Sequence, residues 1–283
     1  MEKKIGFVLS GGGFNGGYQA GVMHQLYHKG IVADFLYGTS VGAINAVAYS
    51  YGGATELLTL WRSVEKRSDI IAFNIKAALT FQGLYSLNPL RNKLSGLLAQ
   101  EKVGPGIATV VFSDLHTQGP AYAHNVEKYN LSDRLGLMSF LDAIIASASI
   151  PGAVQPVNNR FVDGGVTDPL PLYKALREKC TDIYIILNEP LGKETWSIPK
   201  KTNVLTFVLH SSHVLTHEVI MHTLDAVRIP GPTSVHLYAP QERKHGSLDF
   251  SASAVAGLIL EGQTAEEIVD WKKIVSEYFI VEY

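Results

Sequence analysis

The sequence has little cysteine and lacks long apolar runs. Its single cysteine is Cys180, and one cysteine cannot form a disulfide within its own chain, which favours a reducing, intracellular setting. No apolar run approaches the roughly 20 residues that a membrane-spanning helix needs. The apolar run near the N-terminus is too short for a signal peptide. We therefore expect a cytoplasmic protein, with peripheral contact to a membrane left open.

Charge of one sign is also scarce. The 283 residues include 24 Lys and Arg and 26 Asp and Glu, which gives a formal net charge of −2. Such a balance provides no basic field to attract nucleic acid, and we expect no nucleic-acid partner. The length fits one large α/β domain with ample core better than it fits two small domains. No internal repeat or low-complexity segment is visible, and no feature indicates an oligomeric state.

A glycine-rich stretch follows the first apolar segment. Residues 5–9 are apolar throughout, as in a strand buried on both faces of a parallel sheet. Residues 11–17 include five glycines, and residues 18–28 have helical spacing. A strand, a glycine loop and a helix together present unshielded backbone amides to an anion. Residues 11–16 satisfy G-x-G-x-x-G, so the anion is either a nucleotide pyrophosphate or the oxyanion of acyl transfer.

A second motif lies at residues 36–46. Its pattern predicts the end of a strand, a sharp turn and the start of a helix. Residues 38–42 read Gly-Thr-Ser-Val-Gly, the G-x-S-x-G pattern of a nucleophile elbow. Ser40 would sit on a strained turn, and the flanking glycines would let strand and helix approach closely. Because adjacent parallel strands end at one edge of a sheet, this elbow favours the oxyanion as the ligand of the glycine loop.

A serine nucleophile needs a positioned base. Histidine is the usual choice, but Ser40 follows only one strand–helix unit, which argues against the α/β-hydrolase fold. The histidines of the chain also lack a turn context. A carboxylate is the alternative, and Asp163 sits at a predicted turn with Gly164 and Gly165 behind a short strand. Asp-Gly-Gly is also a common turn in proteins of every kind, so a purely structural role stays open.

These motifs, in this order, resemble those of the patatin-like phospholipase family. The resemblance rests on the glycine loop at 11–17, the elbow at 38–42 and Asp-Gly-Gly at 163–165, and it extends over about residues 5–187. The Ala-Ser-rich segment at 146–152, which includes Pro151, is similar to a family segment as well. The resemblance implies a three-layer α/β fold with a mostly parallel central sheet flanked by helices. It also implies hydrolysis of acyl esters of lipids without a metal or organic cofactor.

The resemblance assigns roles to single residues. Ser40 would be the nucleophile and Asp163 the general base of a Ser-Asp dyad. Amides of Gly11, Gly12 and Gly13 would form the oxyanion hole. Asn15 departs from the pattern, since the family usually has arginine or lysine in this loop, although asparagine is itself a donor. The departure supports a second hypothesis, in which a catalytically weak or inactive relative binds a lipid or a partner protein.

Three further stretches carry predictions. We expect one domain over 1–283, with a motif-bearing core at about 5–190 and a helical C-terminal extension at about 210–283. Residues 70–98 are apolar and poor in charge, and they either pack on the core or form an acyl-chain groove or membrane-facing cap. Residues 210–222 form a predicted helix with four histidines. It lacks the full zinc-helix motif, so a half-buried polar face is favoured over a metal site.

Overall fold

The computed structural model describes residues 3–79, 83–101, 104–126, 138–192, 204–242 and 250–280. Within these residues the central feature is a seven-stranded sheet with the order β6-β5-β2-β1-β8-β9, in which β7 pairs with β5. The parallel strands are β1 (Ile5–Leu9), β2 (Phe35–Thr39), β5 (Ile107–Asp114), β8 (Asp182–Ile186) and β9 (Ser234–Tyr238). The strands β6 (Gly119–His124) and β7 (Phe161–Asp163) run antiparallel to β5.

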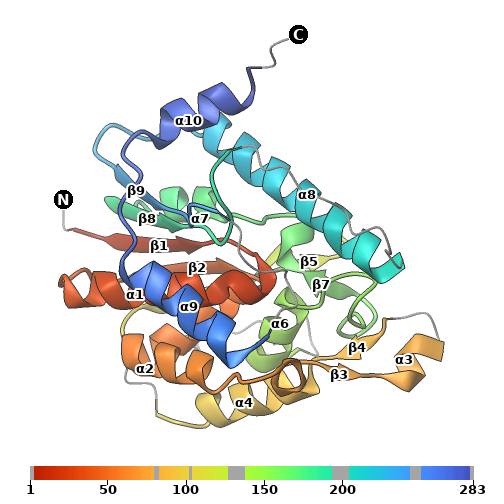
Figure 1. Cartoon of the computed structure of the whole chain (residues 1–283). Coiled ribbons are helices and arrows are strands. Elements are labelled where there is room, and N and C mark those ends of the chain that lie inside the picture. Colours follow the sequence, from red (N-terminus) through yellow and green to blue (C-terminus); the bar gives the residue numbers. More distant parts are fainter. Residues whose placement is uncertain are drawn as a thin grey trace.

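Helices cover both faces of this sheet (Figure 1). One face carries α1 (Gly16–His28), α2 (Val41–Arg62), α4 (Asn88–Leu98), α6 (Phe140–Ser147) and α9 (Ala252–Gln263). The other carries α7 (Leu172–Arg177), α8 (Val204–Ala226) and α10 (Trp271–Tyr278). Each face has its own cluster of buried apolar side chains. The predicted three-layer α/β fold with a mostly parallel sheet is therefore confirmed.

The central strands are apolar because helices cover them on both sides, and β1 is buried from its second residue onward. The helix α2 changes direction at Gly53, where φ is 71°. The helix α2 therefore consists of two helical halves that meet at this glycine.

The C-terminal region is part of the same body. A Cβ atom on Gly21 of α1 would lie 2.2 Å from the carbonyl oxygen of Ile259 in α9, and one on Gly262 would lie 2.1 Å from that of Tyr18. The two helices therefore meet backbone to backbone. The predicted helical extension over about 210–283 also contains a strand, because β9 pairs in parallel with β8. A five-residue edge strand has too short a pattern to stand out between long helices.

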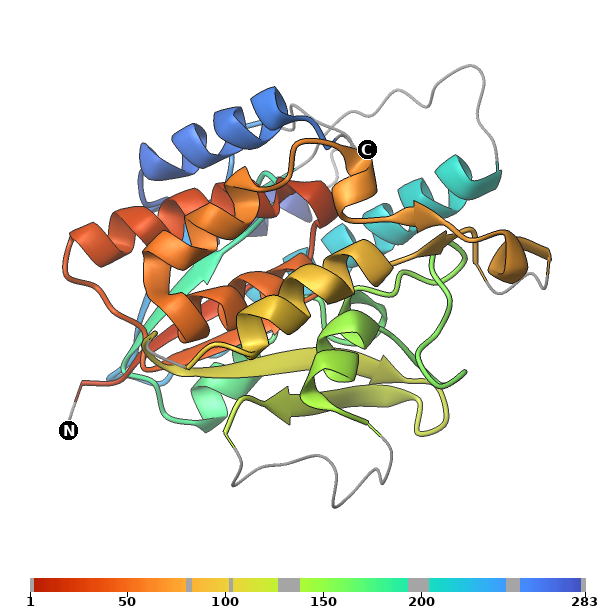
Figure 2. The same cartoon turned by 90° about the horizontal axis from the view of Figure 1, so that it is seen from below.

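A small projection extends from the body. It consists of β3 (Ala72–Phe73), α3 (Ile75–Leu79) and β4 (Tyr85–Ser86), in which β3 and β4 pair antiparallel. In both views it lies on the same side of the molecule as the N-terminal end of α8 (Figures 1 and 2). Among the helices in the described ranges, none has the length and apolarity needed to cross a bilayer.

Candidate active site

Ser40 occupies the turn between β2 and α2, and the turn is sterically strained. Its φ and ψ are 55° and −124°, a region that a residue with a Cβ rarely adopts. A Cβ on Gly38 would lie 2.2 Å from the carbonyl oxygen of Gly42, and one on Gly42 would lie 2.5 Å from that of Leu9. Both glycines of the motif are therefore required by the close approach of strand and helix.

The register of three strands brings Asp163 to Ser40. Along one side of β5, Thr39 at the end of β2 lies opposite Val111, and Asp163 at the end of β7 lies opposite Phe112. Because β7 runs antiparallel to β5, the two strands end facing each other. The hydroxyl of Ser40 donates a 2.7 Å hydrogen bond to Oδ2 of Asp163 across 123 positions of sequence.

The Asp163 carboxylate is held on its other side too. Its Oδ1 accepts a 2.7 Å hydrogen bond from the amide of Gly165. Its backbone carbonyl accepts one from the Ser113 hydroxyl at 2.8 Å. A Cβ on Gly164 would lie 2.4 Å from the carbonyl oxygen of Val111, so the Asp-Gly-Gly turn packs directly against β5.

Burial changes the proton affinity of this carboxylate. Desolvation raises the pKa of Asp163 to about 7, although the hydrogen bonds from Gly165 and Ser40 favour the ionised form and oppose the shift. A carboxylate with a pKa near 7 is a stronger base than an ordinary aspartate, and about half of it is ionised at neutral pH. The geometry and the electrostatics together suit proton transfer from the Ser40 hydroxyl.

The Ala-Ser-rich segment contacts both residues of this pair. The Ser147 hydroxyl accepts a 2.8 Å hydrogen bond from the Ser40 amide and donates one to the Val111 carbonyl. The Ser149 carbonyl accepts a 2.9 Å hydrogen bond from the Asp163 amide. Sequence reasoning singled out this segment by resemblance but assigned no role to Ser147.

The glycine loop is fixed by the side chain of Asn188, which lies just after β8. The Asn188 amide donates to the carbonyls of Ser10 and Gly11, at 3.0 and 3.2 Å. The Gly11 amide itself donates to the Pro169 carbonyl at 3.2 Å, so it is not available to an oxyanion here. Within the described part of the chain, no acceptor is bonded to the amides of Gly12 and Gly13.

Asn15 lies apart from the pocket that Ser40 faces. It is buried just before α1, and its side-chain amide is 3.5 Å from Oε1 of the buried Glu189. The expectation that Asn15 serves as an oxyanion donor finds no support in this contact, because the amide is directed at a carboxylate behind the loop. Gly13, by contrast, lines the pocket together with Ser40.

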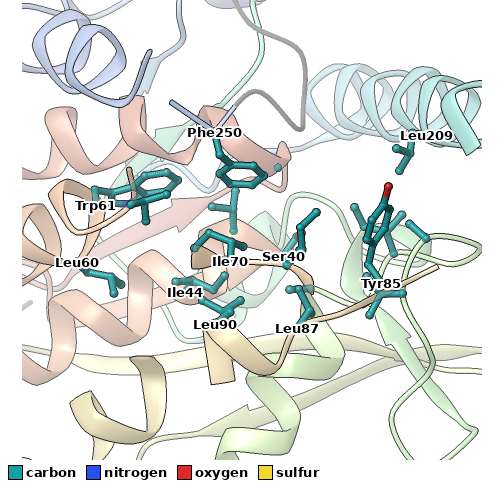
Figure 3. Close-up of a pocket in the computed structure, with 18 residues that line it drawn as sticks. Ser40, Ile44, Leu60, Trp61, Ile70, Tyr85, Leu87, Leu90, Leu209 and Phe250 are labelled. Carbon is teal, nitrogen blue, oxygen red and sulfur yellow. The ribbon is translucent and has the colours of Figure 1, made fainter. Parts of the chain in front are cut away.

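An apolar pocket opens onto Ser40 (Figure 3). It encloses about 860 Å³ of space between its atoms, part of it open to solvent. Its walls are aliphatic and aromatic side chains, among them Val41, Ile44, Leu60, Trp61, Val64, Ile70, Ile71, Tyr85, Leu87, Leu90, Leu209 and Phe250. Residues 70–98 therefore supply one wall of the pocket. Part of the same stretch packs on the core, because Leu94 and Leu97 of α4 are buried.

Three of the four histidines of α8 contact partners outside the helix. His213 has its Nε2 3.5 Å from Oε2 of Glu189, the His217 ring is 3.1 Å from the Gly192 carbonyl, and His222 stacks on Phe279. Burial, and then the nearby histidines, lower the pKa of His213 to about 4, so it is neutral near pH 7. A search of the described residues finds no group of three or more His, Cys, Asp or Glu that could hold a metal ion.

Fold and site define an α/β protein with a serine elbow, a facing aspartate and an apolar pocket. The family model described as patatin-like phospholipase matches residues 7–176. The chain belongs to the patatin-like phospholipase family, as the resemblance predicted. Membership in this family supports a function as a lipid hydrolase.

Relatives match over a stretch of similar length. The chain is 33% identical over 175 residues to uncharacterized NTE family proteins of Mycobacterium bovis and Mycobacterium tuberculosis. The match covers 60% of this chain but only 27% of theirs, so it spans about a quarter of their length. Among solved structures, VipD from Legionella pneumophila aligns with 98% of this chain and 67% of its own, at a TM-score of 0.45 and 11% identity.

Proposed function

We propose that this protein is a phospholipase-like serine esterase, which hydrolyses acyl esters of lipids through a Ser40–Asp163 dyad and an acyl-enzyme. The observation that carries the proposal is the 2.7 Å hydrogen bond from the Ser40 hydroxyl to Asp163 at the wall of an apolar pocket. The strained elbow exposes the hydroxyl to that pocket, and the buried carboxylate has the proton affinity of a base that works near neutral pH.

In the first half-reaction, Ser40 Oγ attacks the ester carbonyl carbon while its proton passes to Asp163 Oδ2. The carbonyl oxygen becomes an oxyanion, for which the amides of Gly12 and Gly13 are the proposed donors. The start of α2 directly behind Ser40 adds the positive end of its dipole. The intermediate collapses, the bond to the alcohol breaks, and the leaving oxygen takes the proton from Asp163.

In the second half-reaction, water replaces the alcohol. Asp163 removes a proton from the water molecule, whose oxygen attacks the acyl carbon of the ester formed on Ser40. A second oxyanion forms at the same amides. When it collapses, the Ser40 oxygen leaves and takes the proton back from Asp163. A fatty acid is released, and the dyad returns to its starting state without any cofactor.

The pocket indicates which part of the substrate is held inside. Apart from Ser40, the backbone of Gly13 and the Tyr85 hydroxyl, its walls offer mainly hydrocarbon and aromatic surface. An acyl chain gains free energy by entering such a pocket, roughly 0.8 kcal/mol for each methylene fully buried. We propose that the acyl chain lies there and that the head group stays outside.

Asn15 keeps a second candidate function open, a lipid- or partner-binding protein without turnover. The family's usual loop cation is absent, and the amide that replaces it contacts Glu189. This candidate predicts an intact fold and an occupied pocket, but a Ser40 hydroxyl that does not react.

Fluorophosphonate labelling followed by peptide mapping distinguishes the two functions. The proposal predicts one adduct, on Ser40, that is lost in Ser40→Ala and strongly slowed in Asp163→Asn. Ser276→Ala, which removes an exposed serine of α10, is the matched control and should label normally. Hydrolysis of p-nitrophenyl esters of increasing chain length gives the parallel turnover measurement. Folded wild-type protein without an adduct would favour the binding protein. Undiminished turnover in Ser40→Ala would exclude Ser40 as the nucleophile.

A further inference from the structure

Large apolar side chains are exposed on the projection and on the first turns of α8. The side chains of Phe73, Ile75 and Leu79 are 64%, 66% and 76% exposed, and that of Phe207 is 58% exposed. We call these four residues the rim patch. The projection and the N-terminal end of α8 lie on the same side of the molecule in both views (Figures 1 and 2).

The rim patch adjoins the pocket on two segments of the chain. The ring of Phe73 packs edge-on against Tyr85, with 6.3 Å between the ring centroids, and Tyr85 lines the pocket. On α8, Leu209 follows Phe207 by two residues and lines the pocket, where Figure 3 shows it beside Tyr85. One residue of the rim patch therefore contacts a pocket-lining side chain, and another lies on a helix that contributes to the pocket.

The charges of the two segments fit one kind of partner. The sequence has no Asp or Glu between positions 70 and 100 or between 204 and 217. Lys76 is exposed on α3, between Ile75 and Leu79. Apolar side chains with a basic residue among them, and no carboxylates on the same segments, suit the interface of a bilayer that contains anionic lipid. Exposed apolar residues elsewhere, such as Leu260 and Val269, belong to other segments of the surface.

We propose that the rim patch docks the protein on a lipid bilayer, with Phe73, Ile75, Leu79 and Phe207 inserted among the lipids and the pocket mouth facing the acyl layer. The functional value of this contact rests on the proposed hydrolase activity, because a lipid ester would then reach Ser40 without crossing water. The docking itself depends on surface residues and needs no chemistry at Ser40.

Vesicle cosedimentation tests the proposal with full-length protein and vesicles of phosphatidylcholine, alone or with one-third phosphatidylglycerol. We expect the Ile75→Ser/Leu79→Ser double variant and Phe207→Ser each to lower the partition coefficient at least fivefold. The control Leu260→Ser/Val269→Ser, which removes equally exposed side chains elsewhere, should bind as wild type does. None of the substituted residues lines the pocket, so cleavage of a soluble short-chain ester should stay unchanged in all of them.

Ser40→Ala separates this proposal from the proposed function, because it should bind vesicles as wild type does. Binding without ester cleavage in wild type would sink the hydrolase assignment and leave the docking surface intact. Unchanged binding of both rim-patch variants, or an equal loss in the control, would overturn the docking surface. A wild-type dimer that the rim-patch variants convert to a monomer would overturn it as well, since a second copy would then cover the patch.

Discussion

The backbone amide of Ser40 donates its hydrogen bond to the side chain of Ser147, at 2.8 Å. Ser40 is held in a conformation with positive φ, and such a conformation persists only where surrounding contacts enforce it. Ser147 is fully buried and passes the hydrogen bond on to the Val111 carbonyl of β5. The elbow is thus tied to the same strand that sets the position of Asp163.

Ser147→Ala should weaken the elbow. The buried amide of Ser40 would lose its acceptor, at a cost of roughly 1–3 kcal/mol in the free energy of unfolding. We expect turnover to fall further than stability alone explains, because the hydroxyl would no longer be held on Asp163. Urea unfolding and ester kinetics below the unfolding transition measure the two effects.

The matched control for Ser147→Ala is Ser50→Ala. Ser50 is also fully buried and also accepts one hydrogen bond, from Asn125, and donates one, to Val47. It should lose similar stability and keep its turnover. If both variants lose turnover to the same extent, Ser147 has no special part in positioning Ser40.

The activity should rise with pH through about 7. Burial raises the pKa of Asp163 to about 7, and only the ionised carboxylate can take the Ser40 proton. A plot of kcat/KM against pH for a soluble ester should therefore have its acidic inflection near 7 rather than near 4.

Asp168 is the control for that assignment. Burial raises its pKa to about 6, but its Oδ2 accepts from the Tyr122 hydroxyl and not from Ser40. Asp168→Asn should leave the inflection in place. If the inflection moves in Asp168→Asn, it belongs to Asp168, and its assignment to Asp163 is wrong.

Asp163→Asn should gain stability relative to wild type as the pH rises. The pKa of Asp163 is higher in the folded chain than in the unfolded one, so the folded state binds the proton more tightly. The stabilisation from that proton is complete below about pH 4 and is lost as the pH rises through 7. The quantity to measure is the unfolding free energy of Asp163→Asn minus that of wild type. We expect this difference to grow by a few kcal/mol between pH 4 and 8, because each unit of pKa shift corresponds to about 1.4 kcal/mol. A difference that is constant over this range would show that Asp163 ionises at its ordinary pKa.

Gly12→Ala should disable the glycine loop. Gly12 has a φ of 146°, and a Cβ there would lie 2.4 Å from the Cβ of Asn188. Because Asn188 holds the carbonyls of Ser10 and Gly11, relief of this clash would turn the loop amides away from Ser40. We expect kcat to fall at least a hundredfold, close to the loss of an oxyanion donor.

Gly96→Ala is the control for Gly12→Ala. A Cβ on Gly96 of α4 has no neighbour within 4 Å, and alanine favours a helix interior by roughly 1 kcal/mol. It should unfold at higher urea concentration with unchanged kcat. If Gly12→Ala and Gly96→Ala have the same kcat, the glycine loop has no part in the mechanism.

Local sterics explain what could be predicted before the fold was known. Gly38 packs against Gly42 within the turn itself, so the elbow is visible in five letters, although Gly42 also packs against Leu9 of β1. Uninterrupted apolar segments likewise predict strands buried on both faces, as in β1. The motif order then indicated the family, and the family model confirmed it.

Only the tertiary structure decided which hydrogen-bond partner each polar group has. No local pattern shows that β7 continues the line of β2 along β5, which is why Asp163 meets Ser40. Nor does a pattern show that the Gly11 amide goes to Pro169, or that Asn15 turns to Glu189. A backbone turn is set by sterics within a few residues, whereas a hydrogen bond goes to whichever acceptor the packing of distant segments brings within 3 Å or so. The sequence therefore determined the reactive turn, and the packed sheet determined what that turn can react with and through which donors.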